Sequence, residues 1–323
     1  MKIKTFLIGL GQIGMGYDFK ENYSSFCLTH LNAILAHDNF DLIGGFDISI
    51  ENRNRFESKT SIESFSDLIV GLEKSSPEFV IIATPTKTHF EILKSVVNIK
   101  TVKAILCEKP ISHDLSEASE MINLCDQNQI KLFVNYQRYY LPSSEKIKTK
   151  LSPLGIPLSF LKGVCWYSKG LLHNGSHFIN LLEYWLGDLL EISIIETHNY
   201  WSEEDFEPDA LMKFQNGNIF FLSSRESDFS NYSIELVTSD GKLTYKNGGA
   251  EINWQSKIQD SVYKDYTTLS LNIEDIVSES NMSQYFVLDQ IRKYLLTNDN
   301  SRVCEAITTL NMMKLLQKLK DTK

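Results

Sequence analysis

The sequence predicts an α/β domain with a parallel, doubly wound sheet, followed by an α+β domain with a large, mostly antiparallel open sheet. Over residues 1–135, short apolar runs alternate with longer helical stretches. A glycine-rich motif follows the first apolar run. After about residue 150, longer strand-like runs appear, separated by hairpin signals. We therefore expect a first domain over residues 1–135 and a second domain over residues 136–323.

The first domain is expected to contain a sheet that is covered by helices on both faces. Its strands are predicted as near-continuous apolar runs, and such runs alternating with helices are typical of a parallel sheet. The strand-like runs are 4–11, 40–47, 77–85, 103–110 and 131–138, and the helical stretches are 29–39, 61–75, 89–99 and 114–129.

The second domain is expected to be mainly antiparallel. Asn216-Gly217 and Asp240-Gly241 are hairpin signals between strand-like runs. A helix over 174–186 is expected to pack near the sheet, and amphipathic helices are predicted near 283–296 and 302–320. The strand-like runs are 157–167, 189–201, 209–214, 218–226, 232–239 and 242–247.

Composition excludes several classes of partner. The 323 residues are 42% hydrophobic with a formal charge of −9, which argues against binding nucleic acid or an anionic membrane. The longest apolar runs are too short to span a bilayer. The 5 cysteines are odd in number and scattered, as expected of reduced thiols in a cytoplasmic protein.

Gly9, Gly11 and Gly14, which enclose Gln12 and Ile13, form a Gly-x-Gly-x-x-Gly motif directly after the first apolar strand. Glycines there allow a tight turn and let the backbone approach a pyrophosphate, which a helix N-terminus stabilises. Motif and context together predict a dinucleotide-binding Rossmann domain.

Asp47, at the end of the second strand, is the expected ligand of the ribose 2′-hydroxyl of NAD. It lies farther from the glycines than is usual, because 15–29 reads as an insertion before a helix that restarts near Thr29. NADP stays open as an alternative, since Arg53 and Arg55 could accommodate its 2′-phosphate.

Two further motifs follow later strands: Ala-Thr-Pro-Thr-Lys-Thr-His over 83–89 and Cys-Glu-Lys-Pro over 107–110. A Gly-x-His helix, with the histidine at residue 177, follows about 65 residues later. This order of motifs resembles the glucose–fructose oxidoreductase, inositol dehydrogenase and rhizopine-catabolism (Gfo/Idh/MocA) family of NAD(P)-dependent oxidoreductases. The resemblance is strong over the first 140 residues. Over the rest of the chain it rests on the general pattern of strand-like and helical runs.

The resemblance implies roles for several residues. Lys109 matches the family's lysine near the nicotinamide and the sugar, and His177 matches its acid/base histidine. Thr84, Pro85, His89 and Glu108 match positions on the cofactor side. The sequence departs from the family where His173 and Asn180 replace acidic residues.

His173, His177 and Asn180 are spaced to share one helical face. A metal site is disfavoured because Asn174 stands where zinc helices carry a glutamate and no third ligand is evident. The alternative is that both histidines have only a structural role. We favour an active-site face, with His173 and Asn180 bonding neighbouring hydroxyls of the substrate.

The expected activity is reversible hydride transfer at a secondary alcohol or ketone of a sugar or nucleotide-linked sugar. Analogy with family members suggests a role in surface-polysaccharide biosynthesis. His177 would take the proton and Lys109 would stabilise the alkoxide, or the two roles would be exchanged. The alternatives are a non-catalytic dinucleotide-binding regulator and a reductase of another small C=O or C=N substrate. The resemblance also implies a homodimer or homotetramer.

Three further features are weaker candidates for functional sites. Gln137 and Arg138 follow the sixth strand and are expected to reach the substrate. A structural ion pair of the arginine stays open as the alternative. A run of charged residues, 202–209, is expected to be a solvated loop. Four aromatic residues are read as core more readily than as a sugar-stacking wall: Trp166, Tyr167, Tyr184 and Trp185.

Overall fold

The computed structural model describes residues 2–202, 205–297 and 303–321, and the chain forms two compact units. The first unit comprises the chain up to Tyr140 together with residues 281–314. The second comprises Leu141–Ser280 and the chain from Leu315. The sequence-based boundary after residue 135 lies near Tyr140. The described residues within 281–314, however, pack with the first unit, although chain order had suggested the second.

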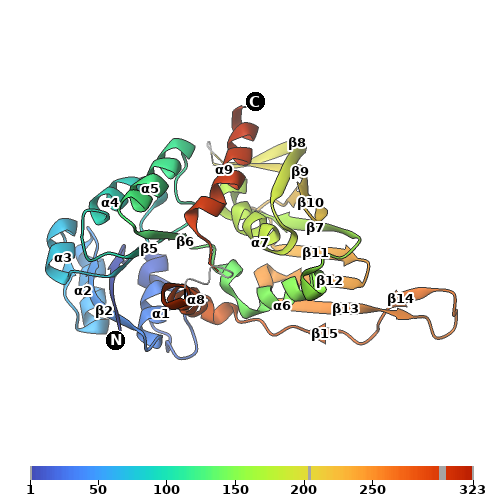
Figure 1. The fold of residues 1–323 in the computed structure, drawn as a ribbon, viewed down its shortest axis with the longest axis horizontal. Coiled ribbons are helices and arrows are strands. Elements are labelled where there is room, and N and C mark those ends of the chain that lie inside the picture. The colour runs from blue at the N-terminus through green and yellow to red at the C-terminus, as the bar shows by residue number, and fades with distance from the viewer. Residues whose placement is uncertain (1, 203–204, 298–302, 322–323) are drawn as a thin grey trace. The chain divides into compact units, whose positions relative to one another are not determined.

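The first unit is built on a six-stranded parallel sheet in the order β3-β2-β1-β4-β5-β6. Figure 1 labels β2, β5 and β6 of this sheet. Its strands are β1 (Ile3–Ile8), β2 (Phe40–Phe46), β3 (Ser64–Phe65), β4 (Phe79–Ile82), β5 (Ala104–Cys107) and β6 (Lys131–Val134). Its helices are α1 (His30–Ala36), α2 (Ile50–Thr60), α3 (Leu68–Ser75), α4 (His89–Val96), α5 (Leu115–Gln127) and α8 (Ser283–Thr297). Helix α9 (Ala306–Asp321) begins in this unit and ends in the second.

The apolar runs explain why this sheet is covered on both faces. Strands β4 and β5 are buried at every residue, which removes both faces from water and matches the parallel arrangement. Four helices of this unit begin where the sequence provides a capping side chain. Thr29, Ser49, Asp67 and Asp114 each accept a hydrogen bond from the first turn of α1, α2, α3 and α5 respectively. The predicted fold class of this domain is confirmed.

The insertion between the glycine motif and α1 is held by one buried carboxylate. Asp18 is 1% exposed and accepts hydrogen bonds from the backbone N–H groups of Leu28 (2.7 Å) and Thr29 (3.2 Å). Because Thr29 also caps α1, Asp18 fixes the point at which the helix starts. The predicted restart of a helix near Thr29 is confirmed.

Helix α8 joins the first unit through α1 and the insertion. The backbone N–H of Cys27 donates to Asn281 (2.8 Å), and the N–H of Gln284 donates to the Cys27 carbonyl (3.0 Å). Arg292 donates from Nε to the Asn39 side chain (2.9 Å). These contacts explain why α8 packs with the first unit although it follows the second in the chain.

The second unit contains a nine-stranded sheet in the order β14-β13-β12-β11-β7-β10-β9-β8, with β15 paired to β13. Neighbouring strands are antiparallel except β7 and β10, which run parallel. The strands are β7 (Leu161–Tyr167), β8 (Leu189–Ser202), β9 (Asp205–Phe214), β10 (Gly217–Ser223), β11 (Ser233–Thr238), β12 (Gly241–Lys246), β13 (Glu251–Gln259), β14 (Thr267–Leu269) and β15 (Glu274–Asp275), and the helices are α6 (Pro142–Leu151) and α7 (Ser176–Leu186).

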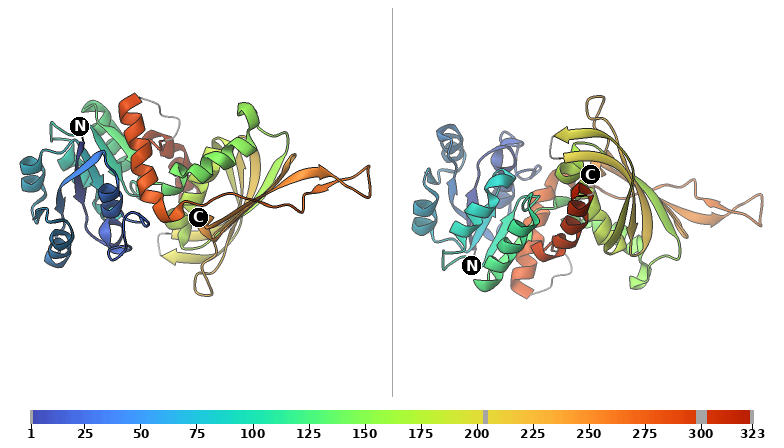
Figure 2. Two further views of the ribbon diagram at one scale, coloured as in Figure 1. Left: turned by 90° about the horizontal axis from the view of Figure 1, so that it is seen from below. Right: turned by 90° about the horizontal axis from the view of Figure 1, so that it is seen from above.

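This sheet curves around α6 and α7, which lie against one of its faces (Figure 2). Alternation places Leu243 and Tyr245 of β12 in the core, where Tyr245 meets Trp185 of α7 edge-on at 5.7 Å. The other face is more exposed; for example, Phe220 is 46% exposed. The predicted mostly antiparallel open sheet is confirmed.

Both predicted hairpins form, joining β9 to β10 and β11 to β12. Strands β13–β15 were not predicted. Part of this segment forms a long hairpin that extends from the sheet (Figure 1), so its side chains lack the regular burial that makes a strand recognisable in sequence. Among the described residues, every helix is too short or too polar to cross a membrane.

Candidate active site

The glycine motif forms a closed turn between β1 and a short π-helical segment, η1 (Gln12–Gly16). Gly9 has φ +93°, and a Cβ there would lie 2.7 Å from the Ala83 carbonyl carbon. A Cβ at Gly14 would clash with the Gly9 carbonyl oxygen. At Gly11, by contrast, an added Cβ would meet no atom within 4 Å. Two glycines therefore close the turn, and Gly11 leaves backbone exposed to open space.

Asp47 stands beside this turn at the end of β2. Its Oδ2 accepts hydrogen bonds from the Leu10 backbone N–H (2.8 Å) and the Asn52 side chain (3.1 Å), and its Oδ1 accepts from the Ser49 N–H (2.8 Å). Arg53 donates to the Asp47 carbonyl oxygen at 2.7 Å. Arg55 instead lies over the Phe19 ring of the insertion, 4.5 Å from its centroid. Of the two arginines considered for NADP, Arg53 is the one that bonds to the Asp47 turn.

A pocket of about 730 Å³ opens at the glycine turn. It lies at the carboxyl ends of β1, β2 and β4, where the strand order reverses and open α/β sheets bind their ligands. Of the residues expected to contact a dinucleotide, five line it: Gly9, Gly11, Asp47, Thr84 and Pro85. The sequence did not single out Ile48, Asn52, Leu68 and Ile92, which supply much of the rest of the wall.

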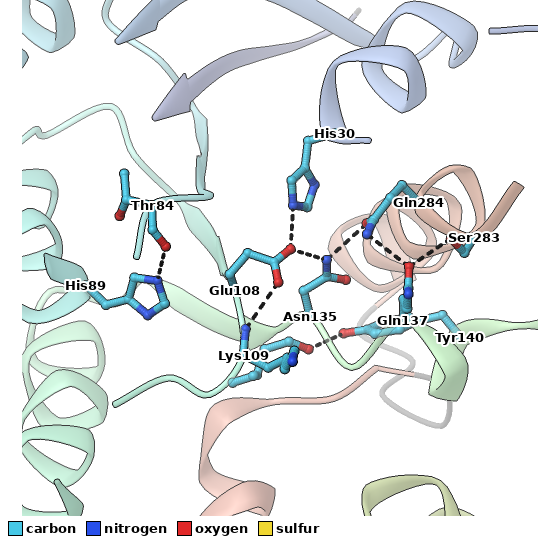
Figure 3. Close-up of polar contacts among 11 residues, drawn as sticks. His30, Thr84, His89, Glu108, Lys109, Asn135, Gln137, Tyr140, Ser283 and Gln284 are labelled. Carbon is cyan, nitrogen blue, oxygen red and sulfur yellow. Dashed lines mark hydrogen bonds and ion pairs between the residues drawn. The ribbon is translucent and has the colours of Figure 1, made fainter. Parts of the chain in front are cut away.

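His89 lies behind this pocket and joins two loops. Its Nε2 lies 2.9 Å from the Thr84 carbonyl oxygen and its Nδ1 lies 3.1 Å from that of Ile111 (Figure 3 shows the Thr84 contact). Burial lowers the pKa of His89, although both carbonyls favour the protonated ring. His89 thus connects the loop after β4 to the segment that follows Lys109 and Pro110.

Glu108 is the centre of a buried polar network (Figure 3). Its Oε1 lies 2.7 Å from Nε2 of His30 and accepts a hydrogen bond from Asn135 (2.6 Å), and its Oε2 accepts from the Lys109 backbone N–H (3.3 Å). Burial raises the pKa of Glu108, but the hydrogen bonds and charges around it, above all from His30, lower it by more. Glu108 is therefore ionised at neutral pH and holds the backbone that carries Lys109.

The network continues to α8. Asn135 donates to Gln284 (3.1 Å), and Gln137 Oε1 accepts from Gln284 (3.2 Å) and from Ser283 (2.8 Å). The Gln137 side chain, expected at the substrate, is engaged with α8 in this structure. Arg138 lies in the same 3-10 turn, η3 (Gln137–Tyr140). Sequence reasoning missed His30, because nothing in the local pattern of α1 indicates a partner 78 residues away.

The histidines of the second unit lie on two consecutive elements. His173 belongs to a π-helical segment, η5 (Gly170–Gly175), and His177 and Asn180 belong to α7, where they are 7% and 5% exposed. A π turn spans more residues than an α turn, so the three side chains do not follow one continuous α-helical register. The α-helix begins at Ser176, two residues later than the 174–186 helix expected from the sequence.

Two carboxylates from β9 hold η5. Asp205 accepts hydrogen bonds from the backbone N–H groups of Leu172 and His173, both at 2.8 Å, and Glu207 accepts from that of Gly170 (2.9 Å). Both acids are buried, at 6% and 4% exposure. The expectation of a solvated loop over 202–209 is therefore wrong for residues 205–209, which form a strand; residues 203–204 lie outside the described residues.

The aromatic residues separate into core and surface. Tyr167, Tyr184 and Trp185 are buried, which confirms the core interpretation for these three, while Trp166 is 38% exposed. The ring that contacts a candidate site residue is Trp201 of β8, which stacks on His173 with a 6.2 Å centroid separation and a 19° interplanar angle. Within the described residues, no cluster of three or more His, Cys, Asp or Glu side chains is placed to hold a metal ion.

The N-terminal part of the chain matches a known protein family. Residues 3–136 match the family described as "Oxidoreductase family, NAD-binding Rossmann fold" (GFO_IDH_MocA). The uncharacterized oxidoreductase YgjR of Escherichia coli is 26% identical over 136 residues, which cover 41% of this chain and 41% of that protein. Glucose-6-phosphate 3-dehydrogenase of Bacillus subtilis is 25% identical over 196 residues, 59% of this chain and 55% of the relative. The chain therefore spans about half the length of these curated relatives.

Solved structures match over nearly the whole chain. The WlbA dehydrogenase of Bordetella pertussis, in complex with NADH and UDP-GlcNAcA, superposes with a TM-score of 0.74 at 17% identity and covers 98% of this chain and 94% of that one. At this identity the likeness establishes the fold. The N-terminal part of the chain, residues 3–136, is thus similar to the oxidoreductase family that its sequence motifs resemble.

Proposed function

We propose that this protein is an NAD(P)-dependent oxidoreductase that catalyses reversible hydride transfer at a secondary alcohol or ketone of a sugar or nucleotide-linked sugar. One observation carries the proposal: the exposed glycine backbone, Asp47, Thr84 and Pro85 line a single pocket where the strand order of the parallel sheet reverses. The curated relatives named as sugar or polyol dehydrogenases support the substrate class. A role in surface-polysaccharide biosynthesis is our extension of this analogy.

The pocket fits a dinucleotide. Gly11 presents backbone without a side chain, as a pyrophosphate requires, and Asp47 presents a carboxylate for ribose hydroxyls. Its hydrogen bond from Leu10 holds that carboxylate beside the turn. We propose NAD as the preferred cofactor because the Asp47 carboxylate would repel a 2′-phosphate. NADP is the alternative, because Arg53 could bind that phosphate. Bound NAD(P) would supply the acceptor or donor of hydride.

The chain's own residues would handle the proton and orient the substrate. His177 accepts the hydroxyl proton in our proposal, and Lys109 stabilises the developing alkoxide, or the two exchange roles. The ionised Glu108 holds the Lys109 backbone, which supports a defined position for this lysine. His173, Asn180, Gln137 and Arg138 are proposed to contact neighbouring hydroxyls.

The remaining proposals concern the setting of the enzyme. The scattered, odd-numbered cysteines support a cytoplasmic location. Assembly into a homodimer or homotetramer through the open sheet of the second unit is proposed from the family resemblance, with exposed apolar side chains such as Phe220 in support.

The direct test is a hydride-transfer assay at 340 nm with NAD and NADP. A panel of glucose 6-phosphate, xylose, myo-inositol and UDP-GlcNAcA covers the substrates named for the relatives and structural neighbours. We expect turnover with at least one member. Tight cofactor binding without turnover on any sugar, ketone or imine would contradict the enzyme and favour a non-catalytic regulator.

The assignment of roles is tested by two variants. Lys109→Ala and His177→Ala should each lower kcat by at least about 10²-fold while the affinity for NAD is retained. Lys103→Ala is the matched control, because Lys103 immediately precedes β5, at its opposite end from Lys109, and its side chain is 72% exposed. Unchanged turnover in Lys109→Ala or His177→Ala would refute the role of that residue.

A further inference from the structure

The second unit has a pocket of its own, separate from the dinucleotide pocket. It encloses about 380 Å³ between the end of β8, the start of β9 and the segment after β10. Its lining consists of Tyr200, Trp201, Glu207, Arg225, Glu226 and Ser227. The pocket combines two aromatic rings, two carboxylates and one guanidinium.

The aromatic rings offer flat apolar surface beside a candidate substrate residue. Tyr200 is 60% exposed and Trp201 is 44% exposed. Trp201 also stacks on His173, so one side of its ring is supported by the imidazole. Tyrosine and tryptophan combine a large apolar face with a polar edge, which suits ligands that are partly apolar and partly hydroxylated.

The acids of the pocket are held in fixed positions. Glu207 is 4% exposed and accepts the Gly170 N–H from the same segment that carries His173. Glu226 accepts hydrogen bonds from Ser168 (3.0 Å) and Ser230 (2.7 Å) and pairs with Lys169 at 3.0 Å. Desolvation raises the pKa of Glu226, but these partners lower it by more, so the carboxylate is charged at neutral pH.

The balance of charge selects among ligands. In and beside the lining, the three carboxylates of Glu207, Glu226 and Asp228 outnumber two cations, since Lys169 pairs with Glu226 at 3.0 Å and Arg225 lies 3.5 Å from Asp228. A phosphate or carboxylate ligand would be repelled, whereas hydroxyl groups can donate to the carboxylate oxygens. An uncharged sugar ring has hydroxyls at its edge and C–H groups on its face, which match the carboxylates and the indole respectively.

We propose that this pocket binds an uncharged sugar ring, with one face against Trp201 and its hydroxyls donating to Glu207 and Glu226. The site would receive part of the substrate of the oxidoreductase, and in that respect it rests on the proposed function. A nucleobase could also stack on Trp201, but the phosphates attached to it would meet the acidic lining. The pocket therefore selects the sugar part of a substrate.

The test uses fluorine NMR of the full-length protein labelled with 5-fluorotryptophan. The chain has 4 tryptophans, so four resonances are expected, and Trp201→Phe assigns one of them by its loss. Titration with methyl β-D-glucopyranoside to ~100 mM, a range suited to the millimolar affinity of a small neutral ligand, should shift the Trp201 resonance saturably. Trp166, 38% exposed on β7, is the control and should not shift.

Two further variants separate this site from general surface binding. Glu226→Gln should weaken the sugar about 3-fold to 10-fold by removing a charged acceptor. Glu235→Gln is the matched control and should change the affinity less than 2-fold, because Glu235 lies outside the lining and pairs with Lys242 at 2.9 Å as Glu226 pairs with Lys169. The unshifted resonances of the other tryptophans report that each variant is folded.

The proposal is overturned if the Trp201 resonance does not move, if Trp166 moves equally, or if UMP shifts Trp201 and the glucoside does not. The measurement needs neither cofactor nor turnover. Failure here therefore leaves the hydride-transfer proposal standing, and failure of that assay leaves this binding site standing.

Discussion

The two compact units each contain a turn of the same construction. Gly9, with φ +93°, precedes the π-helical segment η1, and Gly170, with φ +79°, begins the π-helical segment η5. In each turn a carboxylate from a neighbouring strand end accepts backbone N–H groups. Asp47 binds Leu10 in the first turn, and Asp205 binds Leu172 and His173 in the second.

The two turns differ in what they present to a ligand. The first has glycine at its exposed position, so it offers backbone groups and room. The second carries His173 and leads directly to His177, so it offers titratable side chains. The same type of backbone turn thus suits a pyrophosphate-binding loop in one unit and candidate proton-transfer and substrate-binding side chains in the other.

The largest effect is expected at Gly9. Gly9→Ala places a Cβ 2.7 Å from the Ala83 backbone at positive φ, so the free energy of unfolding should fall by about 3–4 kcal/mol and NADH binding should be lost. Gly11→Ala has open space around its Cβ and should leave stability within about 0.5 kcal/mol while weakening NADH at least about 10-fold. Urea unfolding and calorimetry measure the two quantities. Equal NADH affinity in Gly11→Ala and the parent would break the comparison.

The next effect concerns the acid of the second turn. Asp205→Ala removes a charged acceptor of two backbone N–H groups at 2.8 Å, and should lower the free energy of unfolding by about 2–3 kcal/mol. It should also loosen His173 from Trp201, which fluorine NMR of labelled tryptophan detects. NADH affinity should be unchanged, because the first turn is intact. A large loss of NADH affinity would mean that the two turns do not act separately.

A smaller effect separates charge from hydrogen bonding at Asp47. Asp47→Asn keeps an oxygen acceptor for the Leu10 N–H but removes the charge. The ratio of NADPH to NADH affinity should rise about 10-fold, because a 2′-phosphate no longer meets a carboxylate. Asp41→Asn, on an exposed position of β2, is the control. An unchanged ratio would show that Asp47 holds the turn without selecting the cofactor.

The smallest effect belongs to an acid outside both turns. The His37 ring, whose Nε2 lies 3.8 Å from Oδ1, and the Lys293 ammonium, 2.7 Å from Oδ2, lower the pKa of Asp289 on α8 to about 2, against the opposing effect of burial. Because the folded-state pKa is below the unfolded value, the stabilisation is complete above about pH 4 and is lost as pH falls toward 2.

Asp289→Asn should therefore cost less than about 1 kcal/mol at pH 6, since the carboxylate is partly exposed to solvent. The cost should approach zero near pH 2. Thermal unfolding at several pH values measures this difference, and a cost that is independent of pH would contradict the assignment. NADH affinity should not change, so Asp289→Asn is also a control for the NADH affinities of variants in the two turns.

The turns also show how far the sequence could predict the molecule. The glycine motif, Asp47 and the restart at Thr29 were predicted because their signals are local or belong to a known spacing. The Asp205 contact with His173 spans 32 residues, and the His30 contact with Glu108 spans 78. Such pairs are created by tertiary packing, so a single sequence gives no periodicity or motif from which to infer them.

The same reason explains the errors. The charged run that includes Asp205 and Glu207 resembles a solvated loop by composition, yet both acids are buried because backbone N–H groups of η5 satisfy them. Helix α8 has an ordinary amphipathic pattern, and only its contacts with the insertion and α1 place it in the first unit.

The central claim is that the glycine turn and Asp47 form a dinucleotide site that prefers NADH. It is tested most directly by calorimetric titration of the unmodified protein with NADH and then with NADPH. Calorimetry measures the affinity of each nucleotide directly. The account predicts saturable binding of NADH that is tighter than that of NADPH. Binding of neither nucleotide would contradict it.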